Sequence, residues 1–129
     1  MPPKPIELVI PAERGWHAVV RLVLGGVGDR CNLGFDELDD LQLAVERLLA
    51  EAAPQDSVHI SLEAREEGMR VRVGPLHEGT IADALQGPEP RPGELTLRRV
   101  LETVVDSFGV EEAEDGRLVV RLDKAVRGR

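Results

Sequence analysis

Residues Phe35 to Ala53 read FDELDDLQLAVERLLAEAA, and this stretch decides the fold of the chain. Asp36 stands where an N-cap belongs, acidic residues fill the first turn, and Pro54 ends the segment. Glu46 lies near its middle, where a lone carboxylate is typical of a solvated helix face. The spacing predicts an amphipathic helix with one buried stripe, formed by Leu38, Leu41, Val45, Leu48, Leu49 and Ala52.

The residues before this helix predict a strand and a second helix. Alternation of apolar residues from Ile6 to Ile10 indicates a strand that ends at Pro11. Helical spacing then runs from Trp16 to Val27, although three glycines weaken the last turns. Arg21 lies off the apolar face of this helix, and by pattern alone it is typical of a solvated charge.

The residues after the central helix predict two hairpins and a third helix. Strands at 58–62 and 69–73 flank a turn at 66–68. Residues 74–94 hold four prolines and four glycines, which predicts a loop with one helical turn. Helical spacing returns from Leu97 to Phe108, with Gly109 as the expected C-cap. The second hairpin joins 110–113 to 118–122 through an Asp-Gly turn.

This order of elements predicts a single domain with an α/β two-layer sandwich fold. A mixed or antiparallel sheet covered on one face by about three helices accounts for it. The chain has 129 residues, enough for one ordinary core. We place the domain at 6–124, after a tail at 1–5 and before a basic tail at 125–129.

Composition excludes several classes of function. The net charge of −8 disfavours binding to nucleic acid or to an anionic membrane surface. Cys31 is the only cysteine, and three scattered histidines lack the spacing of metal ligands, so no metal site is expected. No leader peptide and no apolar run of membrane length is visible, so we expect a cytoplasmic protein.

The run IELVIPAERGWHAVVRLVLGGVGDRCNLGFDELDDLQLAVERLLAEA, which begins at Ile6, resembles the RsbW-type anti-sigma factors. These are small bacterial serine kinases of the GHKL superfamily. The similarity covers about residues 6 to 124 and is tight to about residue 53. It implies a GHKL-like fold. In that family a helix Glu is the general base, and an Asn four residues later holds the magnesium of ATP. Glu46 occupies the first position and Ala50 the second.

The resemblance fails at the other nucleotide-binding motifs as well. The family's Asp-x-Gly-x-Gly lies opposite Pro75-Leu76-His77-Glu78-Gly79, where only Gly79 is retained. The Gly-x-Gly-Leu that cradles phosphates lies opposite residues 94–97, so Leu95 takes the place of a small residue. We therefore expect no ATP or magnesium cofactor, a vestigial general base at Glu46, and a pseudokinase rather than an enzyme.

The resemblance also implies protein partners. In RsbW-type proteins an Arg of the first helix contacts them, and Arg21 occupies that position. We expect Arg21 to anchor the partner, with His17, Asp29 and Arg30 on the same docking surface. The expected partner is a sigma factor or an antagonist with the STAS fold (an anti-anti-sigma protein). Homodimers are common in the family, so a homodimer is expected here.

Two alternatives remain open at this stage. One is an active anti-sigma serine kinase with an atypical ATP site and Glu46 as base. The other is an architectural subunit that pairs with a catalytically intact paralogue. The nucleotide-binding positions argue against the first alternative, whereas nothing in the sequence separates the second from a binding module.

Overall fold

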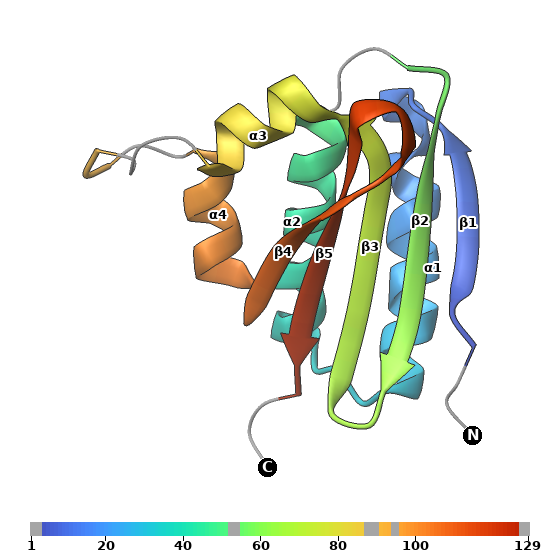
Figure 1. Cartoon of the computed structure of the whole chain (residues 1–129). Coiled ribbons are helices and arrows are strands. Elements are labelled where there is room, and N and C mark those ends of the chain that lie inside the picture. Colours follow the sequence, from blue (N-terminus) through green and yellow to red (C-terminus); the bar gives the residue numbers. More distant parts are fainter. Residues whose placement is uncertain (1–3, 52–54, 87–90, 94–95, 127–129) are drawn as a thin grey trace.

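The computed structural model describes residues 4–51, 55–86, 91–93 and 96–126 (Figure 1). The predicted helix end at Pro54, the position of Leu95 and most of both predicted tails lie outside these residues. The elements in chain order are β1 (Ile6–Pro11), α1 (His17–Arg30), α2 (Phe35–Glu51), β2 (Ser57–Arg65), β3 (Gly68–His77), α3 (Glu78–Gln86), α4 (Leu97–Val104), β4 (Ser107–Glu112) and β5 (Arg117–Ala125), with 3₁₀ turns at Arg14–Trp16 and Glu114–Gly116.

The five strands form one antiparallel sheet in the order β1-β2-β3-β5-β4. Figure 1 shows α1 and α2 running behind the sheet, with α3 and α4 beside α2. The predicted two-layer sandwich is confirmed, and the sheet is antiparallel throughout. The described residues form four α-helices rather than about three, because α3 exceeds the single turn predicted for that segment.

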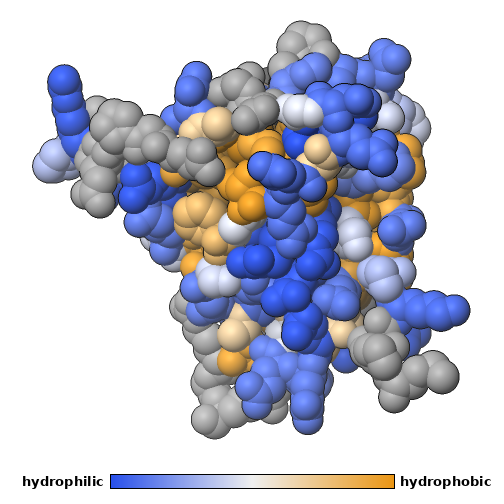
Figure 2. Space-filling view, viewed as in Figure 1, coloured by the Kyte–Doolittle hydropathy of each residue, from blue (hydrophilic) through white to orange (hydrophobic). Residues whose placement is uncertain are grey.

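Alternation along the strands separates a buried face from an open face. In β2 the side chains of Val58, Ile60 and Leu62 are buried between the sheet and the helices. From α2 the core receives Leu41, Val45 and Leu48, as the spacing predicts. The opposite face of the sheet bears mostly polar side chains, visible as the blue band across the middle of Figure 2.

The N-terminus of α2 is capped differently from the prediction. The helix begins at Phe35, and the amide of Gly34 donates to Glu37 Oε1 over 2.7 Å. Gly34 is therefore the N-cap, with Glu37 three residues later as the carboxylate that bonds back to it. The prediction of Asp36 as N-cap is wrong, because Asp36 lies inside the first turn.

The predicted loop at 74–94 is wrong in its first half. Strand β3 continues to His77, with an irregular register between Val73 and Leu76 that accommodates Pro75. Helix α3 follows directly and buries Ile81 and Leu85. Of the four prolines that suggested a loop, Pro75 lies in this strand irregularity and Pro92 follows α3, whereas Pro88 and Pro90 lie outside the described residues.

The last helix is shorter than predicted. Helix α4 ends at Val104, and the chain is already extended at Val105. Phe108 therefore enters β4, where it faces Leu122 in the register of the sheet. Gly109 lies inside β4 and is therefore no C-cap. A Cβ at this position would lie 2.9 Å from the Arg121 guanidinium. The second hairpin is confirmed, with Asp115 and Gly116 at φ values of 60° and 67°, typical of a type I′ turn.

The glycines of α1 allow α1 to pack closely on α2. The helix continues to Arg30 despite them. A Cβ on Gly28 would lie 3.1 Å from Leu38 Cδ1, tighter than ordinary van der Waals contact. Of the three glycines expected to weaken the helix, Gly28 is therefore the one that lies in close contact with α2.

Candidate protein-binding site

The contact between α1 and α2 pairs the two residues that the sequence singled out separately. Arg21 of α1 forms an ion pair with Glu46 of α2 through Nη2 and Oε1. The side chains are 57% and 28% exposed, so the pair lies at the surface. Gln42, one turn before Glu46, donates from Nε2 to the backbone oxygen of Arg21 over 3.2 Å. These two contacts fix the relative position of the helices around the pair.

An apolar groove surrounds this ion pair. It has a volume of about 410 Å³ and is lined by His17, Ala18, Arg21, Leu22 and Glu46. Leu22 is 76% exposed, which is high for a large apolar side chain on a helix. Leu43, one turn before Glu46, is also exposed. We call the five lining residues the α1–α2 groove; it combines apolar surface with the charges of Arg21 and Glu46.

The other predicted partner residues lie apart from the groove. Asp29 and Arg30 are exposed at the end of α1, about 12 Å along the helix axis from Arg21. Phe35, at the start of α2, is 81% exposed. Of the four residues expected on one docking surface, the structure thus brings together Arg21 and His17. Asp29 and Arg30 are the last two residues of α1, next to the connection to α2.

The positions that correspond to nucleotide ligands lack suitable donor groups. Ala50 is an exposed methyl on α2, one turn beyond Glu46. Pro75 and His77 belong to β3, and Gly79 belongs to α3. At the N-terminus of α4, Thr96 Oγ1 accepts from the amide of Arg99 over 3.2 Å, so the helix is capped by its own residue. Ala50 has no oxygen atom in its side chain, so it supplies no magnesium ligand at the position where the resemblance implies one.

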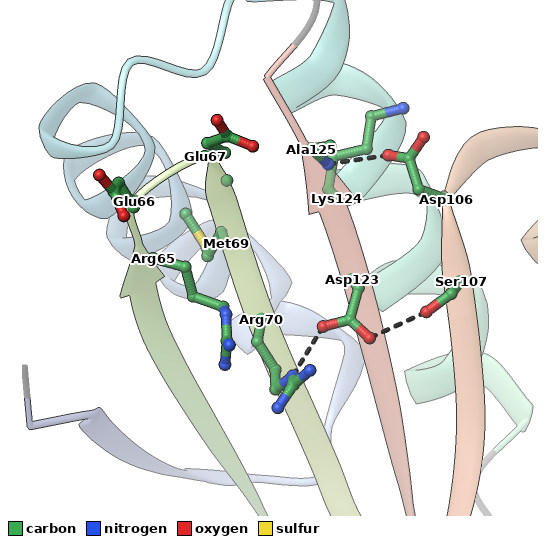
Figure 3. Close-up of a pocket in the computed structure, with 11 residues that line it drawn as sticks. Arg65, Glu66, Glu67, Met69, Arg70, Asp106, Ser107, Asp123, Lys124 and Ala125 are labelled. Atoms are coloured by element: carbon green, nitrogen blue, oxygen red, sulfur yellow. Dashed lines mark hydrogen bonds and ion pairs between the residues drawn. The ribbon is translucent and has the colours of Figure 1, made fainter. Parts of the chain in front are cut away.

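A second charged region lies on the open face of the sheet and was not anticipated. Asp123 of β5 accepts from Arg70 Nε over 2.6 Å, from Arg121 Nε over 3.0 Å and from Ser107 Oγ over 3.0 Å. These four residues are called the sheet network. Figure 3 shows Arg70, Ser107 and Asp123 facing one another beside a cavity of about 460 Å³. The alternation of charged residues along β3 and β5 is the sequence signal that could have predicted this network.

The environment of Asp123 shifts its titration. Partial burial raises the pKa of its carboxyl, but hydrogen bonds from Arg70, Ser107 and Arg121 outweigh that effect and hold the pKa below its ordinary value. The same contact with Asp123 raises the pKa of Arg70. The network is therefore charged throughout the physiological range.

A buried lysine lies on the opposite face of the same strand. Lys124 Nζ donates to the backbone oxygen of Val104 over 2.8 Å and to Asp40 Oδ2 over 3.2 Å. Its side chain is 0% exposed. It therefore ties the last strand to the end of α4 and to α2. The Cys31 thiol is also buried, and burial raises its pKa.

Membrane-spanning helices and metal-binding clusters are absent from the described part of the chain. None of the helices in these residues has the length and apolar character needed to cross a membrane. In the same residues no three His, Cys, Asp or Glu side chains are grouped in a way that could hold a metal ion.

Three known proteins are similar to the chain, although no family model matches it. The serine-protein kinase RsbW of Bacillus velezensis is 40% identical over 47 residues, 36% of this chain and 29% of the relative. RsbW of Bacillus subtilis is 32% identical over 69 residues, 54% and 41% of the two chains. RsbW of Halalkalibacterium halodurans is 25% identical over 138 aligned positions, 95% and 83% of the two chains. The first two matches thus span less than half of the relatives.

These relatives correct one prediction. The expectation that the chain is a pseudokinase and not an enzyme is wrong, because each relative is named a serine-protein kinase. The predicted similarity to the RsbW-type proteins is supported. In sequence the chain is similar to RsbW-type serine-protein kinases, at low identity and in part over limited segments.

Proposed function

We propose that the chain is a regulatory protein of the RsbW type that binds a sigma factor or a STAS-type anti-anti-sigma protein through the α1–α2 groove. The observation that carries the proposal is the position of Arg21. It is a mostly exposed cation beside the exposed Leu22, in a groove with apolar walls. A groove of this kind suits an amphipathic helix that offers apolar side chains and a carboxylate. Pairing as a homodimer is part of the same proposal.

Charge supports a protein partner for this groove. The chain carries a net charge of −8, but Arg21 places a positive charge in a groove whose walls are apolar. An arginine that forms hydrogen bonds with a carboxylate in an apolar surrounding provides both orientation and affinity. The similarity to RsbW proteins supports the same class of partner.

Titration of purified partners tests the proposal. We expect Arg21→Glu and Leu22→Glu each to weaken binding of the cognate sigma factor or STAS-domain protein at least tenfold. Arg65→Glu is the matched control, because Arg65 is an exposed arginine on β2 whose partner is Glu63. Binding that survives both groove substitutions would overturn the assignment of the groove. Thermal unfolding of each variant checks that it is folded.

A second candidate function is phosphoryl transfer to a serine of the bound partner. It is favoured by the names of all three relatives and by Glu46, which occupies the position of the family's general base. ATP would supply the phosphoryl group.

Labelled ATP tests this second candidate directly. The expected result is transfer of labelled phosphate to the purified STAS-domain partner, lost in Glu46→Gln. Thermal unfolding with millimolar Mg-ATP is the companion measurement, since a ligand at a hundred times its Kd stabilises by about 2.7 kcal/mol. The absence of both effects would leave partner binding as the only supported activity.

A further inference from the structure

The ion pair in the α1–α2 groove is single and accessible. Arg21 donates to Glu46 through Nη2, and its side chain is more than half exposed. A guanidinium has five N–H donors, so several remain to receive a second carboxylate while Glu46 is still in place. A second carboxylate can therefore bind before the first one leaves.

We infer that Glu46 determines how tightly the groove binds an acidic partner, because it competes with the partner's carboxylate for Arg21. Binding exchanges one ion pair for another and leaves the carboxylate of Glu46 free in the groove. This inference rests on the proposed function, since it takes a protein partner at Arg21. It assigns Glu46 a role in specificity that does not depend on phosphoryl transfer.

The exchange is energetically accessible. A surface pair of this exposure contributes little net stability, because both charges are well solvated when they separate. The pair formed with a partner would be covered by that partner, and a desolvated charge pair between well-placed groups is stronger than an exposed one. The groove therefore favours a partner carboxylate over Glu46 only when apolar contacts with Leu22 accompany it.

The first test uses no partner. Phenylglyoxal reacts with accessible guanidinium groups, and peptide mass spectrometry reports the reaction rate at Arg21. We expect Glu46→Gln to raise this rate about two- to fivefold, the factor that corresponds to a surface ion pair. Asp39→Asn is the control. Asp39 is an exposed carboxylate on the same helix, about 10 Å from Glu46 along the axis and on a similar side. Equal rates in the wild type and Glu46→Gln would overturn the inference.

The second test measures partner affinity. Purified sigma factors and STAS-domain proteins of the source bacterium are titrated against the wild type, Glu46→Gln, Asp39→Asn and Arg21→Glu. We expect Glu46→Gln to bind about two- to fivefold more tightly, Asp39→Asn to match the wild type, and Arg21→Glu to lose binding.

The two failures can be told apart. If Arg21→Glu abolishes binding but Glu46→Gln does not tighten it, the inference is wrong and the proposed function stands. If Asp39→Asn tightens binding as much as Glu46→Gln, the effect is general electrostatics and the inference is also wrong. If neither Arg21→Glu nor Leu22→Glu changes any titration, the proposed function and the inference fall together.

Discussion

The α1–α2 groove and the sheet network both hold arginines paired with carboxylates, but the pairs differ in how many contacts hold them. In the groove, Arg21 and Glu46 share one ion pair and Arg21 is 57% exposed. In the sheet network, Asp123 accepts three hydrogen bonds from three side chains and is 22% exposed. The first arrangement can separate at little cost, whereas the second must lose several bonds at once.

Burial separates them further. Beside Asp123 in the sequence, Lys124 points to the other side of β5 and has no exposed side-chain surface. The three charged positions thus form a series from fully buried to mostly exposed. We expect their contributions to the free energy of unfolding to follow that series, and their availability to partners to run in the opposite direction.

The largest effect is expected at Lys124. Lys124→Ala removes a buried stem and leaves the backbone oxygen of Val104 without its donor, so the free energy of unfolding should fall by about 3 kcal/mol. Denaturant unfolding followed by circular dichroism measures this. Lys124→Met keeps the stem and should cost less, about 1–2 kcal/mol. A Lys124→Ala protein within about 0.5 kcal/mol of the wild type would contradict the structural role.

A smaller loss of stability is expected in the sheet network. Asp123→Asn removes the charge that Arg70 and Arg121 share, and should cost about 1–2 kcal/mol at pH 7. Ser107→Ala, which removes one neutral donor to the same carboxylate, is the matched control and should cost less. If Ser107→Ala costs more than Asp123→Asn, charge is not what stabilises the network.

The stability contributed by Asp123 should depend on pH. Because the folded-state pKa of this carboxyl is lowered, its contribution is complete above the unfolded-state value of about 4. It is then lost as the pH falls through the folded-state pKa. The difference in stability between wild type and Asp123→Asn should therefore be constant from pH 7 to 5 and shrink below about pH 4. A difference that stays constant to pH 2 would refute the assignment.

The smallest effect on stability is expected at the groove. Arg21→Gln breaks one surface ion pair and should change the free energy of unfolding by less than about 0.5 kcal/mol. Thermal unfolding at low and high salt measures this. A loss above 1 kcal/mol would mean that the pair is structural like the sheet network, and the comparison between the two regions would fail.

Part of the fold and of the site could be predicted from the sequence. The period of two in β2 and β3 and the helical period of α2 are local patterns, so these elements were predicted correctly. Of the stripe predicted for α2, Leu41, Val45 and Leu48 are buried, Leu38 and Leu49 are half-buried, and Ala52 lies outside the described residues. Segments rich in proline or with apolar residues at ambiguous spacing were not predicted correctly. Pro75 suggested a loop but lies in a strand irregularity, and Phe108 fits a helix or a strand until its partner Leu122 is known.

The sequence by itself determined an arginine off the apolar face of the first helix and a carboxylate on the second. It did not predict the buried Lys124, because the predicted last strand ended at residue 122, whereas β5 continues to Ala125. Only the tertiary structure decided their partners. Arg21 and Glu46 are 25 residues apart, and they meet because α1 packs against α2. Lys124 finds Asp40 and Val104 for the same reason, since strand order and helix packing bring together groups that no local pattern relates.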